Sequence, residues 1–245
     1  MTLLERGRYA ARVAETPEET AAVLALRARA FRAGENDADA QDADCLHLMV
    51  APRAGGAPVA ACRILILGSG ADFGRSYAAR FYRVAGIAGV TRPMAEIGRF
   101  CVAPGVEDPD VIRLLWAALT LRLGGSGQDG AGVAWLFGCA SFAGADVARH
   151  RPALALLGAR HTLPERWRVE AATGMSVPLG TLLPGDEDAA RAGLPPLLRS
   201  YLAMGARVGA EAVIDRDLDT IHVFTLLEVA AIPPARLAAL RALAG

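Results

Sequence analysis

The chain has 245 residues, of which 53% are hydrophobic, and its 26 basic residues balance 26 aspartates and glutamates. A net charge of zero argues against a general nucleic-acid binder, and no apolar run reaches the roughly 18–20 residues that a membrane span needs. Every basic residue is an arginine. The absence of lysine excludes a Walker A phosphate loop and a pyridoxal Schiff base.

The N-terminal sequence MTLLERGRYA lacks the apolar core of a signal peptide, and we therefore expect a cytoplasmic protein. Four cysteines lie far apart, without a CxxC spacing: Cys45, Cys62, Cys101 and Cys139. Cysteines in apolar runs are typically buried free thiols, so no metal site is expected.

The first elements are a strand at Tyr9–Ala14 and a helix that runs to about Arg32. Thr16 is expected to cap this helix, since Pro17 and a glutamate at position 19 complete a capping pattern. Arg27 shares the inward face of the apolar stripe. Its side chain either extends to solvent beside the stripe or reaches into a polar site.

Residues 33–44 are small and acidic, which is typical of a mobile loop that orders over a ligand. Two strands follow, Cys45–Val50 and Val59–Leu67, and the second carries Arg63 inside an apolar run. Residues 68–94 are mixed in character and favour irregular helix and loop.

The segment AEIGRFCVAP, Ala95–Pro104, predicts a buried strand that contains Glu96 and Arg99. Charged side chains inside such a strand are costly unless they are paired or used for chemistry. An apolar helix, Val111–Leu123, and a return strand, Val133–Cys139, come next. Together these elements indicate an acyl-transfer site.

Next come a helix at Asp146–Leu157, a short strand at Ala171–Val177 and a linker at Pro178–Asp188. A second helix begins at Pro195 and ends near Gly205 or Gly209, and a strand at Ile221–Leu227 and a last helix at Pro233–Leu243 follow. Alternating strands and helices around one sheet favour an α/β or α+β fold. We expect one domain over residues 1–245, with a core at 9–177 and a C-terminal extension at 178–245.

Five motifs occur in order along residues 9–228: Leu26-Arg27-x-Arg29-x-Phe31, His47-Leu48-x-Val50, Glu96-Ile97-Gly98-Arg99-x-Cys101-Val102, Leu136-Phe137-Gly138-Cys139-Ala140-Ser141-Phe142 and Leu194-Pro195-Pro196-Leu197-Leu198-x-x-Tyr201-Leu202-x-x-Gly205. In this order they resemble the ornithine–acyl carrier protein N-acyltransferases of the GNAT superfamily, and more distantly the acyl-homoserine lactone synthases. One position departs from the family. Leu46 stands where the family carries an aspartate, and Asp44 is the nearest acid that precedes it.

The resemblance implies a GNAT-like acyltransferase fold, with a mixed central sheet flanked by helices and no bound cofactor. It implies transfer of a 3-hydroxyacyl chain from acyl carrier protein to the α-amine of an amino acid, which gives a lyso-aminolipid. Ornithine is favoured by the family, and glutamine, lysine and glycine stay open. A lipid product allows peripheral contact with a membrane.

Glu96 is the candidate general base, since an amino-acid α-amine must lose a proton at a cost of roughly 1.4–2.7 kcal/mol before it attacks a thioester. An ion pair with Arg63 or Arg99 is its alternative role. Backbone N–H groups near Cys101 and Val102 are candidates for the oxyanion site. Ser141 either protonates the leaving thiolate or simply ends its strand.

The acceptor's carboxylate suits a bidentate arginine, and the candidates are Arg27, Arg63 and Arg99. The δ-ammonium of ornithine suits an anion, for which the candidates are Asp44, Asp215 and Asp219. Tyr201 lines the acyl channel or packs in the core.

Two other functions stay open. An acyl-homoserine lactone synthase would use S-adenosylmethionine as the acceptor, and a haemolysin-like protein would perturb membranes without catalysis. The arginine-rich segment Arg149–Arg168 is either a solvated face or a dock for an acidic partner.

Overall fold

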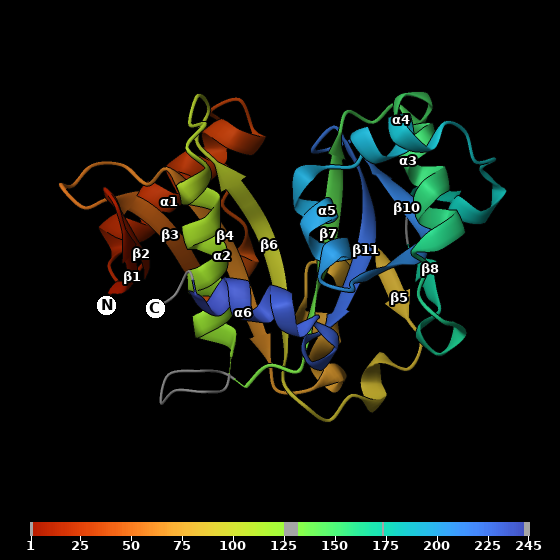
Figure 1. The fold of residues 1–245 in the computed structure, drawn as a ribbon, viewed down its shortest axis with the longest axis horizontal. Helices are drawn as coiled ribbons and strands as arrows, with labels where there is room; N and C mark the ends of the chain where they lie inside the picture. Colours follow the sequence, from red (N-terminus) through yellow and green to blue (C-terminus); the bar gives the residue numbers. More distant parts are fainter. Residues whose placement is uncertain (1, 125–131, 173, 243–245) are drawn as a thin grey trace. The chain divides into compact units, whose positions relative to one another are not determined.

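The structure, a computed structural model, describes residues 2–124, 132–172 and 174–242. It divides into two compact units (Figure 1). Unit 1 comprises Met1–Ile66, Ala95–Val133 and Pro234–Gly245, and unit 2 comprises Leu67–Met94 and Ala134–Pro233. Each unit is therefore assembled from segments that are distant in the sequence. Among the described residues, no helix is long and apolar enough to cross a membrane.

Unit 1 is built on strands in the order β1-β2-β3-β4-β6. Its elements are β1 (Thr2–Arg6), β2 (Tyr9–Val13), α1 (Pro17–Phe31), the 3-10 helix η1 (Ala40–Asp44), β3 (Leu46–Pro52), β4 (Ala60–Leu67), β6 (Met94–Val102), α2 (Pro109–Leu123) and α6 (Pro234–Ala242). Strands β1 to β4 are antiparallel neighbours.

Helix α1 begins where the sequence predicts. The hydroxyl of Thr16 accepts a hydrogen bond from the backbone N–H of Glu19, at 3.2 Å, and the Glu19 carboxylate pairs with Arg12. Its inward side chains Val23 and Leu26 pack in one core cluster with Met49 of β3. Arg27 follows Leu26 directly and is buried beside this apolar contact. The helix thus carries a guanidinium into the interior of unit 1.

Unit 2 contains an antiparallel sheet in the order β7-β11-β10-β9 and a two-stranded sheet of β5 and β8. Its strands and α-helices are β5 (Tyr82–Val84), β7 (Trp135–Ala143), α3 (Val147–Arg160), β8 (Val169–Ala171), β9 (Met175–Pro178), α4 (Glu187–Ala192), α5 (Pro196–Ala203), β10 (Arg207–Asp215) and β11 (Thr220–Glu228). Its 3-10 helices are η2 (Gly70–Arg75), η3 (Ala78–Arg80), η4 (Ile87–Gly89), η5 (Glu165–Trp167), η6 (Leu179–Thr181) and η7 (Val229–Ala231).

Strand β11 shows how the two faces of this sheet differ. Ile221 and Val223 belong to an aliphatic core cluster that includes Leu154 of α3. The alternate residues His222 and Phe224 contact aromatic rings from the segment before β6. One face of the sheet is therefore covered by helices and the other by an aromatic cluster.

The structure contains most of the predicted helices and strands, together with several that the sequence did not predict. Strand β1, helix α4 and strand β10 were not expected, and residues 68–94 contain the short strand β5 besides irregular helix. The predicted strand over residues 171–177 is replaced by β8 and β9, and position 173 lies outside the described residues. Position 243, the end of the predicted last helix, lies outside them as well.

Candidate active site

The charged interior of unit 1 begins with Arg27, whose side chain has no exposed surface. Its Nε donates to Oδ2 of Asp37 at 2.8 Å and its Nη1 to Oδ1 of Asp42 at 2.6 Å. Its Nη2 donates to the backbone carbonyl of Asp37 at 2.8 Å. Every nitrogen of this guanidinium is therefore already bound to the segment at residues 37–42.

Arg63 and Arg99 reach the same segment from the sheet. Nη1 of Arg63 on β4 donates to Asp39 at 2.6 Å and to Asp42 at 3.0 Å. Nε of Arg99 on β6 donates to Asp37 at 2.9 Å, and its Nη2 lies 3.7 Å from an oxygen of Asp39. Three guanidiniums thus meet three carboxylates, and a fourth, that of the partly exposed Arg32, lies 3.6 Å from Asp37.

The backbone of the acidic segment is shaped to present its carboxylates. Asp39 caps the 3-10 helix η1, since its side chain accepts from the backbone N–H of Gln41 at 3.0 Å, while Asp42 accepts from the N–H of Asp39 at 2.9 Å. This reciprocal capping turns both carboxylates toward the arginines. Arg99 adopts a left-handed backbone with φ of 50°, which is uncommon for a residue other than glycine and rare inside a strand.

Pairing sets the charge states of this interior. Burial acts to raise the pKa of Asp42, but Arg27, the N–H of Asp39 and Arg63 outweigh it and hold that pKa at about 2. Burial acts to lower the pKa of Arg63, but Asp39 and Asp42 outweigh it and raise that pKa. Both groups are ionised at neutral pH, so their attraction persists through the working range of an enzyme.

Glu96 lies on β6 beside this network and is 5% exposed. The Cys45 thiol lies near Glu96. Burial is the largest cause that raises the pKa of Cys45, to about 11, and the negative charge of Glu96 contributes to the same shift. Burial likewise raises the pKa of Cys101 to about 12. These thiols stay protonated at neutral pH and are poor nucleophiles.

His47, the register partner of Arg63 on β3, lies at the edge of the same network. Its Nε2 is 3.3 Å from the backbone carbonyl of Asp42. Burial lowers the pKa of His47, although Asp42 opposes this shift. The imidazole is therefore neutral at pH 7, and the network gains no further positive charge from it.

The structure gathers Arg27, Arg63, Arg99 and Glu96 in unit 1 and places four other candidates in unit 2. Ser141 is exposed on β7, Tyr201 is buried on α5, and Asp215 accepts hydrogen bonds from the N–H groups of Asp217 and Leu218. Asp219 accepts from the N–H of Ala145. The two aspartates therefore organise the backbone near the β10–β11 turn.

Two predictions need correction. Arg27 does not fit the role of a clamp for the acceptor's carboxylate, because it is fully buried and its nitrogens are bound. The expected mobile loop is instead bound to buried arginines, and its Asp37 is itself buried. The sequence analysis missed Asp37, Asp39 and Asp42, although arginines inside apolar elements must find buried anions. Cys101 packs in the α1 core cluster.

Comparison with known proteins gives a consistent result. Residues 21–117 match the family described as Acetyltransferase (GNAT) domain. The chain is 33% identical to an L-ornithine N(alpha)-acyltransferase of Rhodobacter capsulatus, over 71% of this chain and 65% of that protein. It is 28% identical to one of Agrobacterium fabrum, over 84% of this chain and 72% of that protein.

The chain covers less than two thirds of some of these relatives. It spans 65% of the Rhodobacter protein and 44% of an L-ornithine N(alpha)-acyltransferase of Rhizobium meliloti, to which it is 31% identical over 55% of its own length. A solved structure titled FeeM, an N-acyl amino acid synthase from uncultured soil microbes, aligns over 91% of this chain and 92% of its own, with 13% identity and a TM-score of 0.49. Residues 21–117 of the chain therefore match a GNAT acetyltransferase domain, and most of the chain is similar in sequence to L-ornithine N(alpha)-acyltransferases.

Proposed function

We propose that this chain is an N-acyltransferase that moves a 3-hydroxyacyl group from an acyl carrier protein to the α-amine of an amino acid, with ornithine the first candidate. The observation that carries the proposal is Glu96, a buried carboxylate within the charged interior of unit 1. The family supports it, since relatives are named for acylation of ornithine at its α-nitrogen.

The proposed reaction needs one base and one acid. Glu96 takes a proton from the acceptor's ammonium, and the free amine attacks the thioester carbonyl carbon. The intermediate collapses as the C–N bond is kept and the C–S bond breaks. The leaving thiolate takes a proton from the Ser141 hydroxyl, the second proton of the attacking nitrogen passes through water to restore that hydroxyl, and the proton on Glu96 passes to solvent. The products are an amide, a free thiol and one proton.

Direct transfer is favoured over an acyl-enzyme on a thiol of this interior. The pKa values of Cys45 and Cys101, about 11 and about 12, leave almost no thiolate at neutral pH. The left-handed residue Arg99 interrupts the regular strand conformation two residues before Cys101. Such an irregularity turns backbone N–H groups out of the ladder, which supports the N–H groups near Cys101 and Val102 as oxyanion donors.

The amino-acid substrate is best accommodated where the charged network reaches the surface, at Asp39. The side chain of Asp39 is 23% exposed, whereas those of Arg63 and Arg99 are 4% and 9% exposed. We place the acceptor's carboxylate on Arg63 and Arg99, where it takes over contacts that Asp39 makes. The freed Asp39 then replaces Asp44, Asp215 and Asp219 as the first candidate to bind a δ-ammonium.

Two features support a carrier protein as the donor. The N-terminus of α2 is occupied by carboxylates of its own chain, since Asp108 accepts from the N–H of Asp110 at 3.1 Å and both pair with arginines. Asp108 therefore occupies an N–H group that would otherwise be available to the pyrophosphate of free coenzyme A. In unit 2, three arginines are exposed near one another: Arg160 and Arg191 pair with Glu187, and Arg207 donates to the backbone carbonyl of Arg160.

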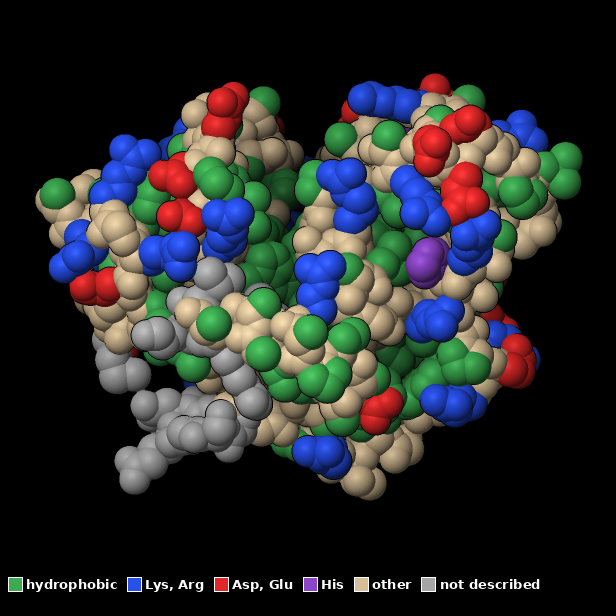
Figure 2. Space-filling view, viewed as in Figure 1, with side chains coloured by type: hydrophobic (Ala, Val, Ile, Leu, Met, Phe, Trp, Pro, Cys, Tyr) green, Lys and Arg blue, Asp and Glu red, His purple; other side chains and the backbone are tan. Residues whose placement is uncertain are grey.

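Figure 2 shows basic side chains gathered over the part of unit 2 that contains α3 and α4. Helix α4 also carries Asp188 and is capped by Asp186, so this surface is mixed in charge, and its exposed guanidiniums are the part that would bind an acidic protein. In the predicted segment Arg149–Arg168, by contrast, Arg168 is neutralised by Glu165 and Glu170. The dock is therefore assigned to Arg160, Arg191 and Arg207.

The test is an acceptor and donor screen. Purified protein is incubated with a 3-hydroxyacyl thioester, on carrier protein or on coenzyme A, together with one amino acid or S-adenosylmethionine. Mass spectrometry identifies the products. We expect N-acyl ornithine from the carrier-protein donor. Product with S-adenosylmethionine alone would move the assignment to a lactone synthase, and no product from any combination would refute acyl transfer.

A further inference from the structure

Two buried polar atoms on β11 have no hydrogen-bond partner within the described residues: Nε2 of His222 and Oγ1 of Thr220. His222 is 1% exposed. The two residues are separated by one position, so their side chains share a face of the strand and their Cα atoms lie about 7 Å apart. A buried polar atom without a partner costs free energy, which a bound ligand can recover.

The contacts of His222 identify what its free nitrogen needs. The Tyr82 hydroxyl donates to the backbone carbonyl of His222 at 2.7 Å and lies 2.9 Å from its Nδ1. Because a phenol has one proton, Nδ1 must carry its own proton and donate it to the Tyr82 oxygen. Burial lowers the pKa of His222 to about 4, so the ring is neutral. Nε2 then carries no proton and can accept a hydrogen bond from a hydroxyl or N–H group.

The surroundings of these atoms are aromatic. The rings of Phe81 and Tyr82 lie 4.8 and 5.5 Å from the His222 ring, and Phe224 on the same face of β11 contacts Phe73 at 6.1 Å. An apolar wall with one acceptor and one hydroxyl is suited to a hydrocarbon that carries a single hydroxyl group. It is poorly suited to an ion.

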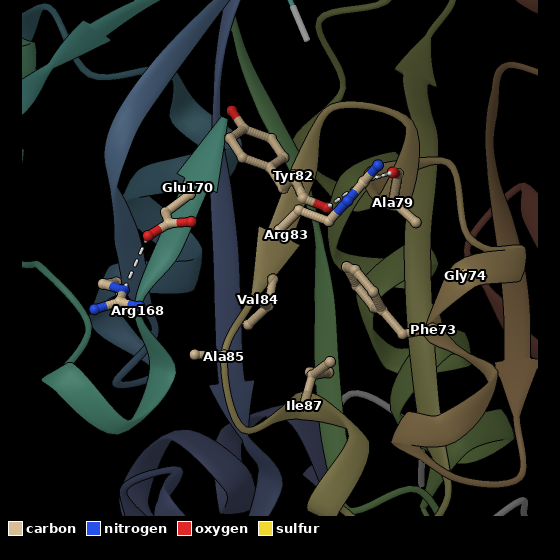
Figure 3. Close-up of a pocket in the computed structure, with 10 residues that line it drawn as sticks. All are labelled: Phe73, Gly74, Ala79, Tyr82, Arg83, Val84, Ala85, Ile87, Arg168 and Glu170. Atoms are coloured by element: carbon tan, nitrogen blue, oxygen red, sulfur yellow. Dashed lines mark hydrogen bonds and ion pairs between the residues drawn. The ribbon is translucent and has the colours of Figure 1, made fainter. Parts of the chain in front are cut away.

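A cavity of about 510 Å³ adjoins this cluster and shares Phe73 and Tyr82 with it. Figure 3 shows that Val84 and Ile87 also line it, while Arg83 and the Arg168–Glu170 pair bring charged groups to its wall. Its volume lies within the range of small-molecule pockets. The hollow therefore offers space for an apolar chain beside Phe73 and Tyr82 of the aromatic cluster, while His222 and Thr220 do not themselves line it.

We propose that Thr220 and His222 recognise the 3-hydroxyl of the transferred acyl chain, which donates to Nε2 of His222 and accepts from Oγ1 of Thr220. This inference rests on the proposed function. Ser141 is the register partner of His222 on the neighbouring strand β7. The hydroxylated carbon and the thioester carbonyl are separated by one carbon, so a hydroxyl on His222 brings the thioester close to the proposed acid.

The experiment compares kcat/KM for two carrier-protein donors of equal chain length, one with a 3-hydroxyacyl chain and one without the hydroxyl. The wild-type chain should prefer the hydroxylated donor by about tenfold or more, because its absence leaves buried polar atoms unpaired. His222→Phe keeps an aromatic ring against Phe81 and should abolish this preference by lowering kcat/KM for the hydroxylated donor alone. Thr220→Val, which is nearly isosteric, should reduce the preference by a smaller factor.

His150→Phe is the matched control. His150 is also a buried histidine of unit 2, but its Nε2 is 3.0 Å from the carbonyl of Ala143 and so has a partner. This variant should keep the donor preference of the wild type. If His222→Phe fails to fold, the same ratio of kcat/KM for the two donors is measured in Thr220→Val and Tyr82→Phe instead.

The outcomes separate the two proposals. Transfer from both donors with equal kcat/KM, unchanged in Thr220→Val and His222→Phe, would overturn hydroxyl recognition and leave the transferase standing, with the two atoms bridged by water. No transfer from either donor to any amino acid would remove the function on which the inference rests. A preference for the hydroxylated donor that is lost in His222→Phe and kept in His150→Phe would support recognition of the 3-hydroxyl by His222.

Discussion

The best-described clusters of buried polar groups in unit 1 and unit 2 differ in kind. In unit 1 the buried groups are ions, and Arg27, Arg63 and Arg99 each pair with an aspartate of residues 37–42. In unit 2 the His222 ring of the aromatic cluster is neutral, and His222 and Thr220 each keep an atom without a hydrogen-bond partner in the described structure, as Asp37, Asp39 and His47 do in unit 1.

The difference separates positioning from recognition. A buried ion that is paired with a counter-ion contributes geometry, because moving it exposes an uncompensated charge. A buried acceptor without a partner gains free energy when a donor arrives. In the proposed function, the arginine–aspartate network would hold Glu96 and the surroundings of the acceptor in place, and the aromatic cluster would bind the acyl chain.

The largest expected effect concerns chemistry in unit 1. Glu96→Gln keeps the shape of the side chain and removes the base, so kcat should fall by about 10²–10⁴-fold. The rate of amide formation under saturating donor and acceptor measures it. Near-normal turnover in a variant with wild-type circular dichroism would show that the charged interior supplies no base.

The next effect concerns stability. Arg27→Met leaves Asp37 and Asp42 buried without their main counter-ion and should lower the free energy of unfolding by about 3–5 kcal/mol. Arg29→Met, two residues along the same helix at an exposed position, should change it by no more than about 0.5 kcal/mol. Urea titrations of both variants make the comparison, and equal losses would contradict a paired interior.

A pH titration should distinguish the two units. The folded pKa of His222 is depressed to about 4 from 6.5, so the stability that its neutral form contributes is present above pH 6.5 and is lost as the pH falls toward 4. The folded pKa of Asp42 is depressed to about 2 from 3.8, so its contribution is lost only between those two values.

The free energy of unfolding, measured by urea from pH 7 to pH 2, reports both. The wild type should lose stability in the upper window more steeply than His222→Phe, and in the lower window more steeply than Asp42→Asn. Asp44→Asn, at an exposed position of the same segment, should follow the wild type in the lower window. Parallel curves for all four proteins would mean that neither group is perturbed.

The smallest expected effect concerns the thiols. Cys45→Ala should keep kcat within about twofold, because a thiol with a pKa of about 11 contributes no nucleophile at neutral pH. Iodoacetamide should label Cys45 far more slowly at pH 8 than it labels an ordinary thiol. Rapid labelling together with loss of activity would instead indicate an acyl-enzyme route.

The sequence predicted the elements whose signals are local. Thr16 and Pro17 define the start of α1, and the apolar pattern around Ile97 defines β6. Strand β10 was missed because Arg207, Gly209 and Glu211 break its apolar alternation. The 3-10 helices and β5 follow from tertiary packing that no local pattern encodes.

The site was predicted in part. Arginines inside apolar elements indicated buried charge, but the partners of Arg27 lie 10 and 15 residues away in a segment whose composition suggested a loop. The roles of His222 and Thr220 depend on strand register and on a hydroxyl contributed by Tyr82, 140 residues distant from His222. Such long-range contacts cannot be derived from spacing along one chain.

The most direct test of the account is the stoichiometry of one reaction. Free thiol released from a 3-hydroxyacyl carrier protein is measured beside N-acyl ornithine formed by the purified chain. The account predicts ornithine-dependent release, with one amide for each thiol and no acylated enzyme by intact mass. Thiol release without amide, or an acylated cysteine that accumulates when the acceptor is withheld, would contradict direct transfer to an amine.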